Sequence, residues 1–200
     1  DGFIIPGAPV EQMEFEDVDY WDEMCRIMDW TRTHVHSTFH ICWAAQAALY
    51  HHYGIKKYPL DEKLSGIFLH TLLTPKSRLF RVRREDIEKI PQLKVMAVSE
   101  EAGVYAVCSE DSRQFFITGH SEYDADTIAL EYRRDLAKGL EPKIPRHYFP
   151  DDDPTKEPHY SWGCSANLLF SNWLNYCVYQ QTPYDLTSLE LYNWDWQAGL

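Results

Sequence analysis

The stretch TFHICWAAQAALY, residues 38–50, changes from a strand-like to a helix-like pattern at a single cysteine. Residues 38–41 are largely apolar and suit a buried strand, whereas residues 43–50 are rich in good helix formers. Cys42 is therefore predicted to occupy a sharp turn at the N-terminus of a helix. The helix dipole and the free backbone N–H groups at such a position favour a thiolate and can hold an oxyanion. This pattern is typical of a nucleophile elbow built on sulfur.

Apolar runs on both sides of this stretch extend it into alternating strands and helices. The expected strands cover residues 3–5, 35–41, 93–97, 104–108 and 114–118, and the expected helices cover 19–33, 43–54, 127–138 and 167–179. This alternation predicts an α/β fold in which a mostly parallel sheet carries helices on both faces. Ligands bind at the carboxyl ends of strands in such sheets, so the loops at 6–11 and 119–123 should lie near Cys42.

Composition narrows the class of protein. With 200 residues, 44% of them hydrophobic, the chain suits one α/β domain. A net charge of −12 argues against a nucleic-acid or anionic-membrane surface. No apolar run approaches the roughly 20 residues that span a bilayer. The odd set of cysteines lacks C-x-x-C spacing, which favours a reduced, cytoplasmic protein without structural zinc. The chain opens on a strand with no initiator Met, so we expect an upstream part.

The loop GHSEYD, residues 119–124, supplies two partners for the cysteine. His120 and Glu122 are two residues apart and point the same way in an extended chain. Glu122 can then fix the tautomer of the imidazole while His120 faces a nucleophile. Cys42, His120 and Glu122 are therefore a candidate catalytic triad. The residues alone leave a second interpretation open, in which Cys42 is a small residue of the core.

Several histidines raise the question of a metal site. They alternate along the expected strand 35–41 and its approach, and two more follow in the next helix: His34, His36, His40, His51 and His52. They lack a matching carboxylate spacing, which favours packing or surface roles, and no metal is expected.

Two other groups have ordinary structural interpretations. The basic stretch Arg78–Arg84 is expected to be a solvated strand face. The aromatic residues Trp173, Tyr176 and Tyr179 recur at helical spacing and are expected to pack against the core.

Longer strings of the chain resemble the homoserine O-acyltransferases of methionine biosynthesis. The strings occur in family order and cover most of the chain up to Leu186: DGFIIPGAPVEQMEFEDVDYW (1–21), HICWAAQAALYHHY (40–53), GHSEYD (119–124), YFPDDDPTK (148–156) and ANLLFSNWLNYCVYQQTPYDL (166–186). The resemblance implies one catalytic domain over residues 1–186, without the N-terminal part of the family, and a C-terminal tail at 187–200.

The resemblance implies a flavodoxin-like sheet similar to that of class I glutamine amidotransferases, which agrees with the reading of the residues. It also implies that Cys42 takes an acyl group from an acyl-CoA as a thioester. His120, oriented by Glu122, then activates the γ-hydroxyl of homoserine to attack that thioester. The oxyanion is expected to bind the N–H of Trp43 and one N–H from the Gly7–Ala8 loop.

The resemblance also carries over the substrate contacts. Lys63, Ser77 and Arg134 match substrate-binding positions, and Arg134 is expected to hold the homoserine carboxylate. Ser77 also bears on acyl choice, together with Glu11. In the family Glu at this position accompanies acetyl and Gly accompanies succinyl, so acetyl-CoA is the expected donor. The expected partners are L-homoserine and acetyl-CoA as co-substrate, with no other cofactor, in a cytoplasmic homodimer.

The chain departs from the family pattern at several positions. Ala44 replaces a Gly, Ser121 replaces a Pro between the catalytic His and Glu, and the segment between His70 and Ser77 is short. Three alternatives therefore stay open: a homoserine O-succinyltransferase, a glutaminase-type amidotransferase with the same Cys and His-x-Glu residues, and an inactive fragment of the family.

Overall fold

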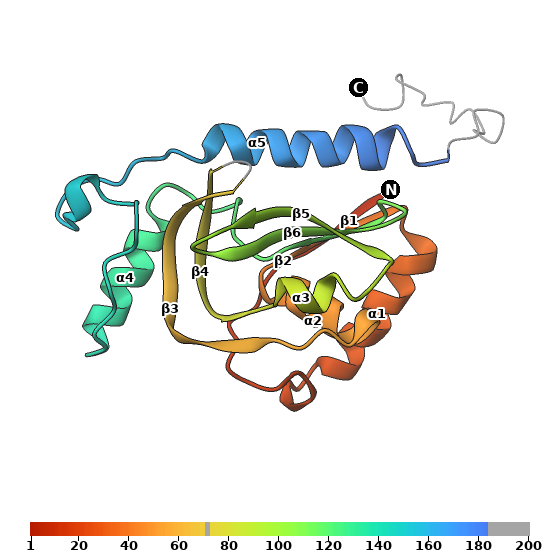
Figure 1. Ribbon diagram of the computed structural model, residues 1–200, viewed down its shortest axis with the longest axis horizontal. Helices are drawn as coiled ribbons and strands as arrows, with labels where there is room; N and C mark the ends of the chain where they lie inside the picture. Colours follow the sequence, from red (N-terminus) through yellow and green to blue (C-terminus); the bar gives the residue numbers. More distant parts are fainter. Residues whose placement is uncertain (71–72, 184–200) are drawn as a thin grey trace, which may run out of the picture.

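The central element is a five-stranded sheet (Figure 1). Its strand order is β1-β2-β7-β6-β5. A computed structural model describes residues 1–70 and 73–183, and gives the backbone alone for 73–75 and 77. The strands are β1 (Gly2–Ile5), β2 (Ser37–Ile41), β5 (Leu93–Ser99), β6 (Gly103–Ser109) and β7 (Gln114–Ile117). β2 pairs parallel with β1 and β7, whereas β6 pairs antiparallel with β7 and β5. Because β1, β2 and β7 run parallel, their carboxyl ends lie at the same edge of the sheet.

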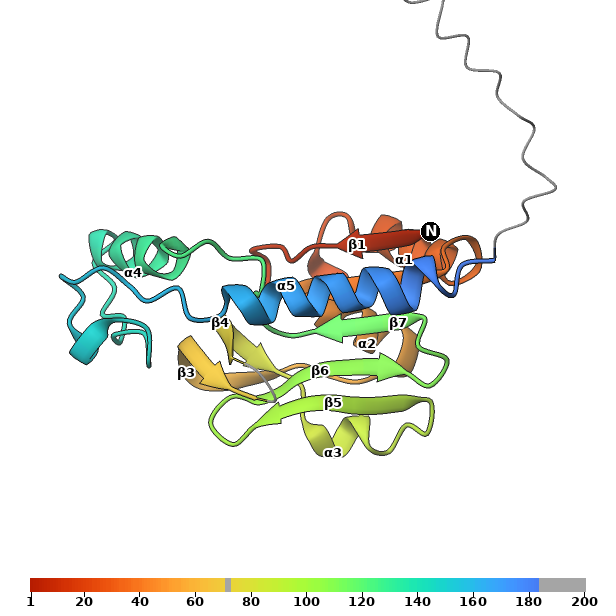
Figure 2. The same ribbon diagram turned by 90° about the horizontal axis from the view of Figure 1, so that it is seen from above.

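Helices cover both faces of this sheet, as the alternating pattern predicted (Figures 1 and 2). One face carries α1 (Trp21–His34), α2 (Trp43–Tyr53) and the short α3 (Arg84–Ile87). The other carries α5 (Gly163–Asn172), which continues as a π-helical segment, Trp173–Tyr179. The α/β class is therefore confirmed. The last helix begins at Gly163, four residues before the expected start.

A fourth long helix lies beside the sheet. α4 (Thr127–Ala137) is followed by Gly139, whose φ of +74° suits the end of a helix. Ile128 and Ala129 of α4 pack with Ile67 and Trp162 in a separate apolar cluster. This cluster fixes α4 next to the site described below. Short 3₁₀ turns lie at Phe15–Asp17 and Pro150–Asp152.

An antiparallel hairpin that the sequence pattern did not predict is formed by β3 (Tyr58–Leu69) and β4 (Leu73–Arg81). The interpretation of 78–84 as a solvated basic face is wrong for Arg78, which is only 1% exposed. Alternate residues of a strand share one face, and Arg78 lies on the same face as the buried Lys76.

The prediction for the aromatic run is confirmed for one residue and wrong for two. Trp173 is buried against Phe39, and its Nε1 donates to Ser37 Oγ at 2.8 Å. Tyr176 and Tyr179 are 59% and 72% exposed. They lie in the π-helical segment, where successive side chains do not keep the α-helical spacing.

In the described part of the chain, no helix is long and apolar enough to cross a membrane. The predicted tail at 187–200 lies outside the described residues.

Candidate active site

Cys42 lies in the sharp turn that the sequence predicted between β2 and α2. Its φ of 53° and ψ of −116° are unusual for a residue other than glycine. The turn is held from both sides, because the N–H of Cys42 donates to Ile117 O at 2.7 Å and Gln46 N–H donates to Cys42 O at 3.2 Å. Trp43 is the first residue of α2, and its side chain is buried. The strained turn therefore presents the thiol at a helix N-terminus.

His120 and Glu122 lie in the loop that follows β7, the strand next to β2. His120 Nδ1 is 2.6 Å from Glu122 Oε1, which leaves Nε2 for the thiol. Burial alone would lower the pKa of His120, but hydrogen bonds with Cys42 and Glu122 raise the pKa to about 10. The structure therefore brings the three predicted side chains together, with His120 between Cys42 and Glu122.

The loop that carries His120 is tied to β6. The hydroxyl groups of Ser121 and Tyr105 share a hydrogen bond in the interior, and Thr118 Oγ1 donates to Val104 O at 2.6 Å. Ser121 stands where the resembling family has a proline, so a hydroxyl contact fixes this position here. The histidine is thereby held at a set distance from the elbow.

The loop after β1 approaches the elbow closely. A Cβ placed on Gly7 would lie 3.0 Å from Cys42 Cβ and 3.6 Å from Cys42 Sγ. This contact is tighter than nearly all real Cβ contacts, so the close approach favours glycine. The backbone of the loop is thereby brought next to the Cys42 sulfur, where the oxyanion contact was predicted.

One cavity of about 340 Å³ opens above the thiol. It gathers most of the predicted site residues at its walls: Ala8, Glu11, Cys42, Lys63, His120, Glu122 and Arg134. Ser77 lies in β4 opposite Ser65, and its side chain is outside the described atoms. A larger cavity of about 400 Å³ lies elsewhere, near Thr31 and Asp111, and contains none of the predicted residues.

The two basic side chains that line the cavity, Lys63 and Arg134, pair with acidic side chains of α4, of which Glu131 also lines the cavity. Lys63 Nζ donates to Glu131 Oε2 at 3.2 Å and to Asp135 Oδ2 at 2.9 Å. Arg134, about half exposed, donates twice to Asp135 Oδ1, at 3.0 and 2.9 Å. Burial would raise the pKa of Asp135, but hydrogen bonds from Lys63 and Arg134 lower it. The site therefore offers both charges to a zwitterionic ligand.

Two of these residues were missed by the sequence reasoning. Glu131 and Asp135 are four apart on α4 and so share one face of the helix. Tyr123, within the quoted GHSEYD string, also lines the cavity and donates to Glu131 Oε1 at 2.9 Å. The i, i+4 pair of carboxylates was the available signal.

Glu11 faces the cavity from the loop after β1. Burial raises the pKa of its carboxyl group, and the N–H of Leu79 and the charge of Lys63 partly offset this. A carboxyl group thus occupies the wall on the side of β4.

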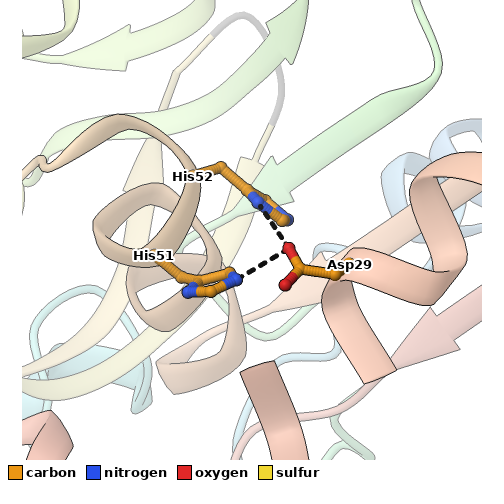
Figure 3. Close-up of side chains that lie close together, drawn as sticks. All are labelled: Asp29, His51 and His52. Atoms are coloured by element: carbon orange, nitrogen blue, oxygen red, sulfur yellow. Dashed lines mark hydrogen bonds and ion pairs between the residues drawn. The ribbon is translucent and has the colours of Figure 1, made fainter. Parts of the chain in front are cut away.

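Of the histidines considered for metal binding, His51 and His52 lie together with Asp29 (Figure 3). His51 Nε2 is 2.8 Å and His52 Nδ1 3.8 Å from Asp29 Oδ1, so the contact joins α2 to α1. His40 instead contacts Phe115 O through Nδ1 at 3.1 Å in the core. We interpret both contacts as structural.

Known proteins with similar sequences point to one enzyme family. The family model described as "HTS: Homoserine O-succinyltransferase" matches residues 1–184. A homoserine O-acetyltransferase of Acetivibrio thermocellus is 60% identical over 205 residues, which cover 95% of this chain and 67% of the relative. A homoserine O-acetyltransferase of Bacteroides thetaiotaomicron is 56% identical, with the same coverage. The chain thus spans about two thirds of the length of these relatives.

Solved structures with low sequence identity share the fold. A glutamine amidotransferase from Thermotoga maritima superposes with a TM-score of 0.63 at 11% identity, over 88% of this chain and 78% of that chain. The protein SMU.1228c gives 0.59 at 12% identity, over 86% and 77%. At this identity the likeness establishes the fold, an amidotransferase-like α/β sheet, and nothing about activity.

Proposed function

Because this chain belongs to the homoserine O-succinyltransferase family, we propose that it transfers an acetyl group from acetyl-CoA to the γ-hydroxyl of L-homoserine. The observation that carries the proposal is the placement of Cys42, His120 and Glu122 at one cavity. The names of relatives at 55–60% identity support the choice of acetyl.

The first half-reaction loads the cysteine. The Cys42 thiolate attacks the thioester carbonyl of acetyl-CoA, and the C–S bond to CoA then breaks. His120 is positively charged in this state, because its pKa is raised by hydrogen bonds to Cys42 and Glu122 despite burial. It can give its Nε2 proton to the departing CoA thiolate. The products are free CoA, an acetyl thioester on Cys42 and a neutral His120.

The second half-reaction transfers the acetyl group from Cys42 to homoserine. Neutral His120 takes the proton of the homoserine hydroxyl while the oxygen attacks the thioester carbonyl. The C–S bond to Cys42 breaks and the sulfur leaves as a thiolate beside the protonated imidazole, which restores the starting state. Glu122 holds Nδ1 throughout and stabilises the positive charge. In both halves the oxyanion is proposed to bind the N–H groups of Trp43 and Ala8.

Glu11 supports acetyl over succinyl as the acyl group. Its carboxyl group lines the same cavity as the thiol. A succinyl group would bring a second carboxylate against it, which costs free energy by repulsion between like charges. An acetyl group has no carboxylate, so this repulsion does not arise.

The cavity also contains charged side chains that are complementary to the carboxylate and the amine of homoserine. Arg134 and Lys63 are proposed to attract the carboxylate of homoserine, together with Ser77 on β4. Glu131 lies within reach of Lys63 and offers negative charge to the substrate amine. No organic cofactor is required, and we further propose a cytoplasmic homodimer on family resemblance.

The test is intact-protein mass spectrometry after incubation with acetyl-CoA. A mass gain of one acetyl group that is absent in Cys42→Ser and discharged by L-homoserine is the expected result. Succinyl-CoA should label far less. A folded wild-type protein that gains no acetyl group would sink the proposal and favour the inactive-fragment alternative. Ammonia release from glutamine without acetyl transfer would favour the amidotransferase alternative.

A further inference from the structure

Lys57 lies just before β3, and its ammonium group contacts the loop that follows β1. Nζ donates to Glu11 O at 2.7 Å and also to Met13 O. These two carbonyl groups belong to a tight turn, because Met13 N–H donates to Val10 O at 3.1 Å. Hydrogen bonds from a charged donor are roughly twice as strong as those between neutral groups. A lysine that is distant in sequence therefore fixes the backbone of the loop at Glu11.

The ammonium group of Lys57 is itself held in place by two aromatic rings. Nζ lies 4.7 Å from the ring centre of Phe15 and 4.7 Å from that of Phe80, and a cation is attracted to the face of such rings. Phe15 is buried in the same core cluster as Trp43, the first residue of α2. Phe80 O in β4 accepts from Gln46 Nε2 of α2 at 3.3 Å. Both rings are thus fixed relative to the helix that follows the elbow.

Glu11 is held at its side chain as well as at its backbone. It lines the cavity that contains the Cys42 thiol, and its carboxyl group accepts from the N–H of Leu79 in β4. The contact with Lys57 sets where the side chain of Glu11 starts, and the contact with Leu79 sets where it ends. Without Lys57 the loop can move, and the carboxyl group is no longer kept in the cavity wall.

We propose that Lys57 is a positioning residue for Glu11, and that it keeps the Glu11 carboxyl group where it discriminates between neutral and anionic acyl groups. The described residues that line the cavity include Glu11 but not Lys57, so Lys57 acts through Glu11. The consequence for acyl transfer rests on the proposed function, in which Glu11 supports acetyl over succinyl.

The sign of the effect separates positioning of Glu11 from a simple effect of the lysine charge. A cation near the cavity attracts anions, so losing the charge of Lys57 alone would make the cavity less favourable to an anionic reagent. Losing the position of Glu11 would make the cavity more favourable to the same reagent, because a carboxylate no longer faces it. The two explanations therefore predict opposite changes.

The test compares two alkylating reagents and needs no acyl transfer. Iodoacetamide and iodoacetate react with Cys42 in the same way, since the sulfur forms a new C–S bond and iodide leaves, but only iodoacetate carries a carboxylate. Peptide mass spectrometry gives both rates at Cys42 without interference from the other cysteines. The amide-to-acetate ratio of these rates, measured at pH 8 where carboxyl groups are ionised, is the discrimination against an anion.

In Lys57→Met we expect this ratio to fall several-fold, towards the value of Glu11→Gln. Lys57→Arg keeps a charged donor and should recover part of the loss. Lys56→Met removes the exposed neighbouring lysine and should leave the ratio unchanged. Adding Lys57→Met to Glu11→Gln should cause no further fall, because residues that act through one another are not additive.

A ratio in folded Lys57→Met that equals or exceeds that of Lys56→Met would overturn the proposal. Lys57→Gln, which keeps a neutral donor, is measured in the same way if Lys57→Met does not fold, and the same fall is expected. With acyl-CoA substrates, Lys57→Met should raise succinyl loading relative to acetyl loading several-fold. A wild-type protein that shows the expected alkylation ratios but takes up no acetyl group would contradict the proposed function and still support the role of Lys57.

Discussion

The imidazole of His120 lies face to face with the ring of Tyr123, with centroids 4.1 Å apart and planes 16° from parallel. The same tyrosine donates its hydroxyl proton to Glu131, which also accepts from Lys63. Tyr123 thus joins His120, the proposed general base, to the charged residues Glu131 and Lys63. Stacking on Tyr123 orients the imidazole of His120, whereas the tyrosine hydroxyl orients the carboxylate of Glu131.

Replacing Tyr123 separates these two effects. Tyr123→Phe keeps the stacked ring, so acetylation of Cys42 should proceed at nearly the wild-type rate, whereas KM for homoserine should rise several-fold because Glu131 loses a donor. Tyr123→Leu loses the stack, and both half-reactions should slow by about tenfold. The two half-reactions are measured separately by mass spectrometry. Equal acetylation rates in the Phe and Leu variants would show that the stack does not position His120.

Glu122→Gln should slow turnover by about 10²-fold or more. Gln has nearly the same shape as Glu but lacks the negative charge, which holds His120 Nδ1–H at 2.6 Å and helps to raise the pKa of His120. The acid limb of the pH–rate profile for acetyl transfer should therefore change as well. Asp124→Asn removes an exposed carboxylate two residues further on and serves as the control. If both variants retain the wild-type profile, Glu122 does not orient the base.

Gly7→Ala should reduce acetylation of Cys42 by at least tenfold while the protein still folds. The added methyl group would meet Cys42 Cβ at 3.0 Å and push the loop away from the sulfur. Gly139→Ala is the matched control, because its Cβ would meet nothing within 4 Å but its φ is +74°. That variant should lose about 1 kcal/mol of stability without losing activity. Melting curves and acetylation rates together distinguish crowding at the site from backbone strain.

The sequence predicted the parallel half of the fold well, because β2 and α2 carry strong local signals. β2 is buried along its whole length and contains Phe39 and Ile41, and α2 ends at Gly54 in the left-handed conformation. The GHSEYD loop follows directly from a strand end. The turn at Cys42 and its meeting with His120 could therefore be predicted from the chain alone.

The β3–β4 hairpin could not be predicted in the same way. Its strands mix charged residues such as Asp61, Glu62 and Lys63 with apolar ones, so no period of two stands out. Lys76 and Arg78 look like surface residues because their burial depends on contacts that are distant in sequence. These contacts go to Ala102, just before β6, and to Val104 of β6. Tertiary contacts of this kind override local pattern.

Stability should depend on pH in two opposite ways. Burial lowers the pKa of His40 to about 4 and that of His52 to about 3, both below the ordinary value of about 6.5. The unfolded chain therefore binds more protons than the folded chain between these values, and stability is lost as pH falls from about 6.5. His120 has the opposite sign, because its pKa is raised to about 10 and its contribution is lost as pH rises from about 6.5 towards 10. A maximum near neutral pH follows.

Urea unfolding across this range tests the acid side. At about pH 5 the wild type should have lost about 2 kcal/mol for each buried histidine relative to neutral pH. His40→Phe replaces a fully buried imidazole that stacks on Phe116, so the variant should lose less stability between neutral pH and pH 5 than the wild type. The comparison concerns this difference, because the substitution also removes the contact of His40 Nδ1 with Phe115 O. His159→Gln changes an exposed histidine and should follow the wild-type curve. A wild-type stability that stays constant from neutral pH to pH 5 would show that these imidazoles are not buried in their neutral form.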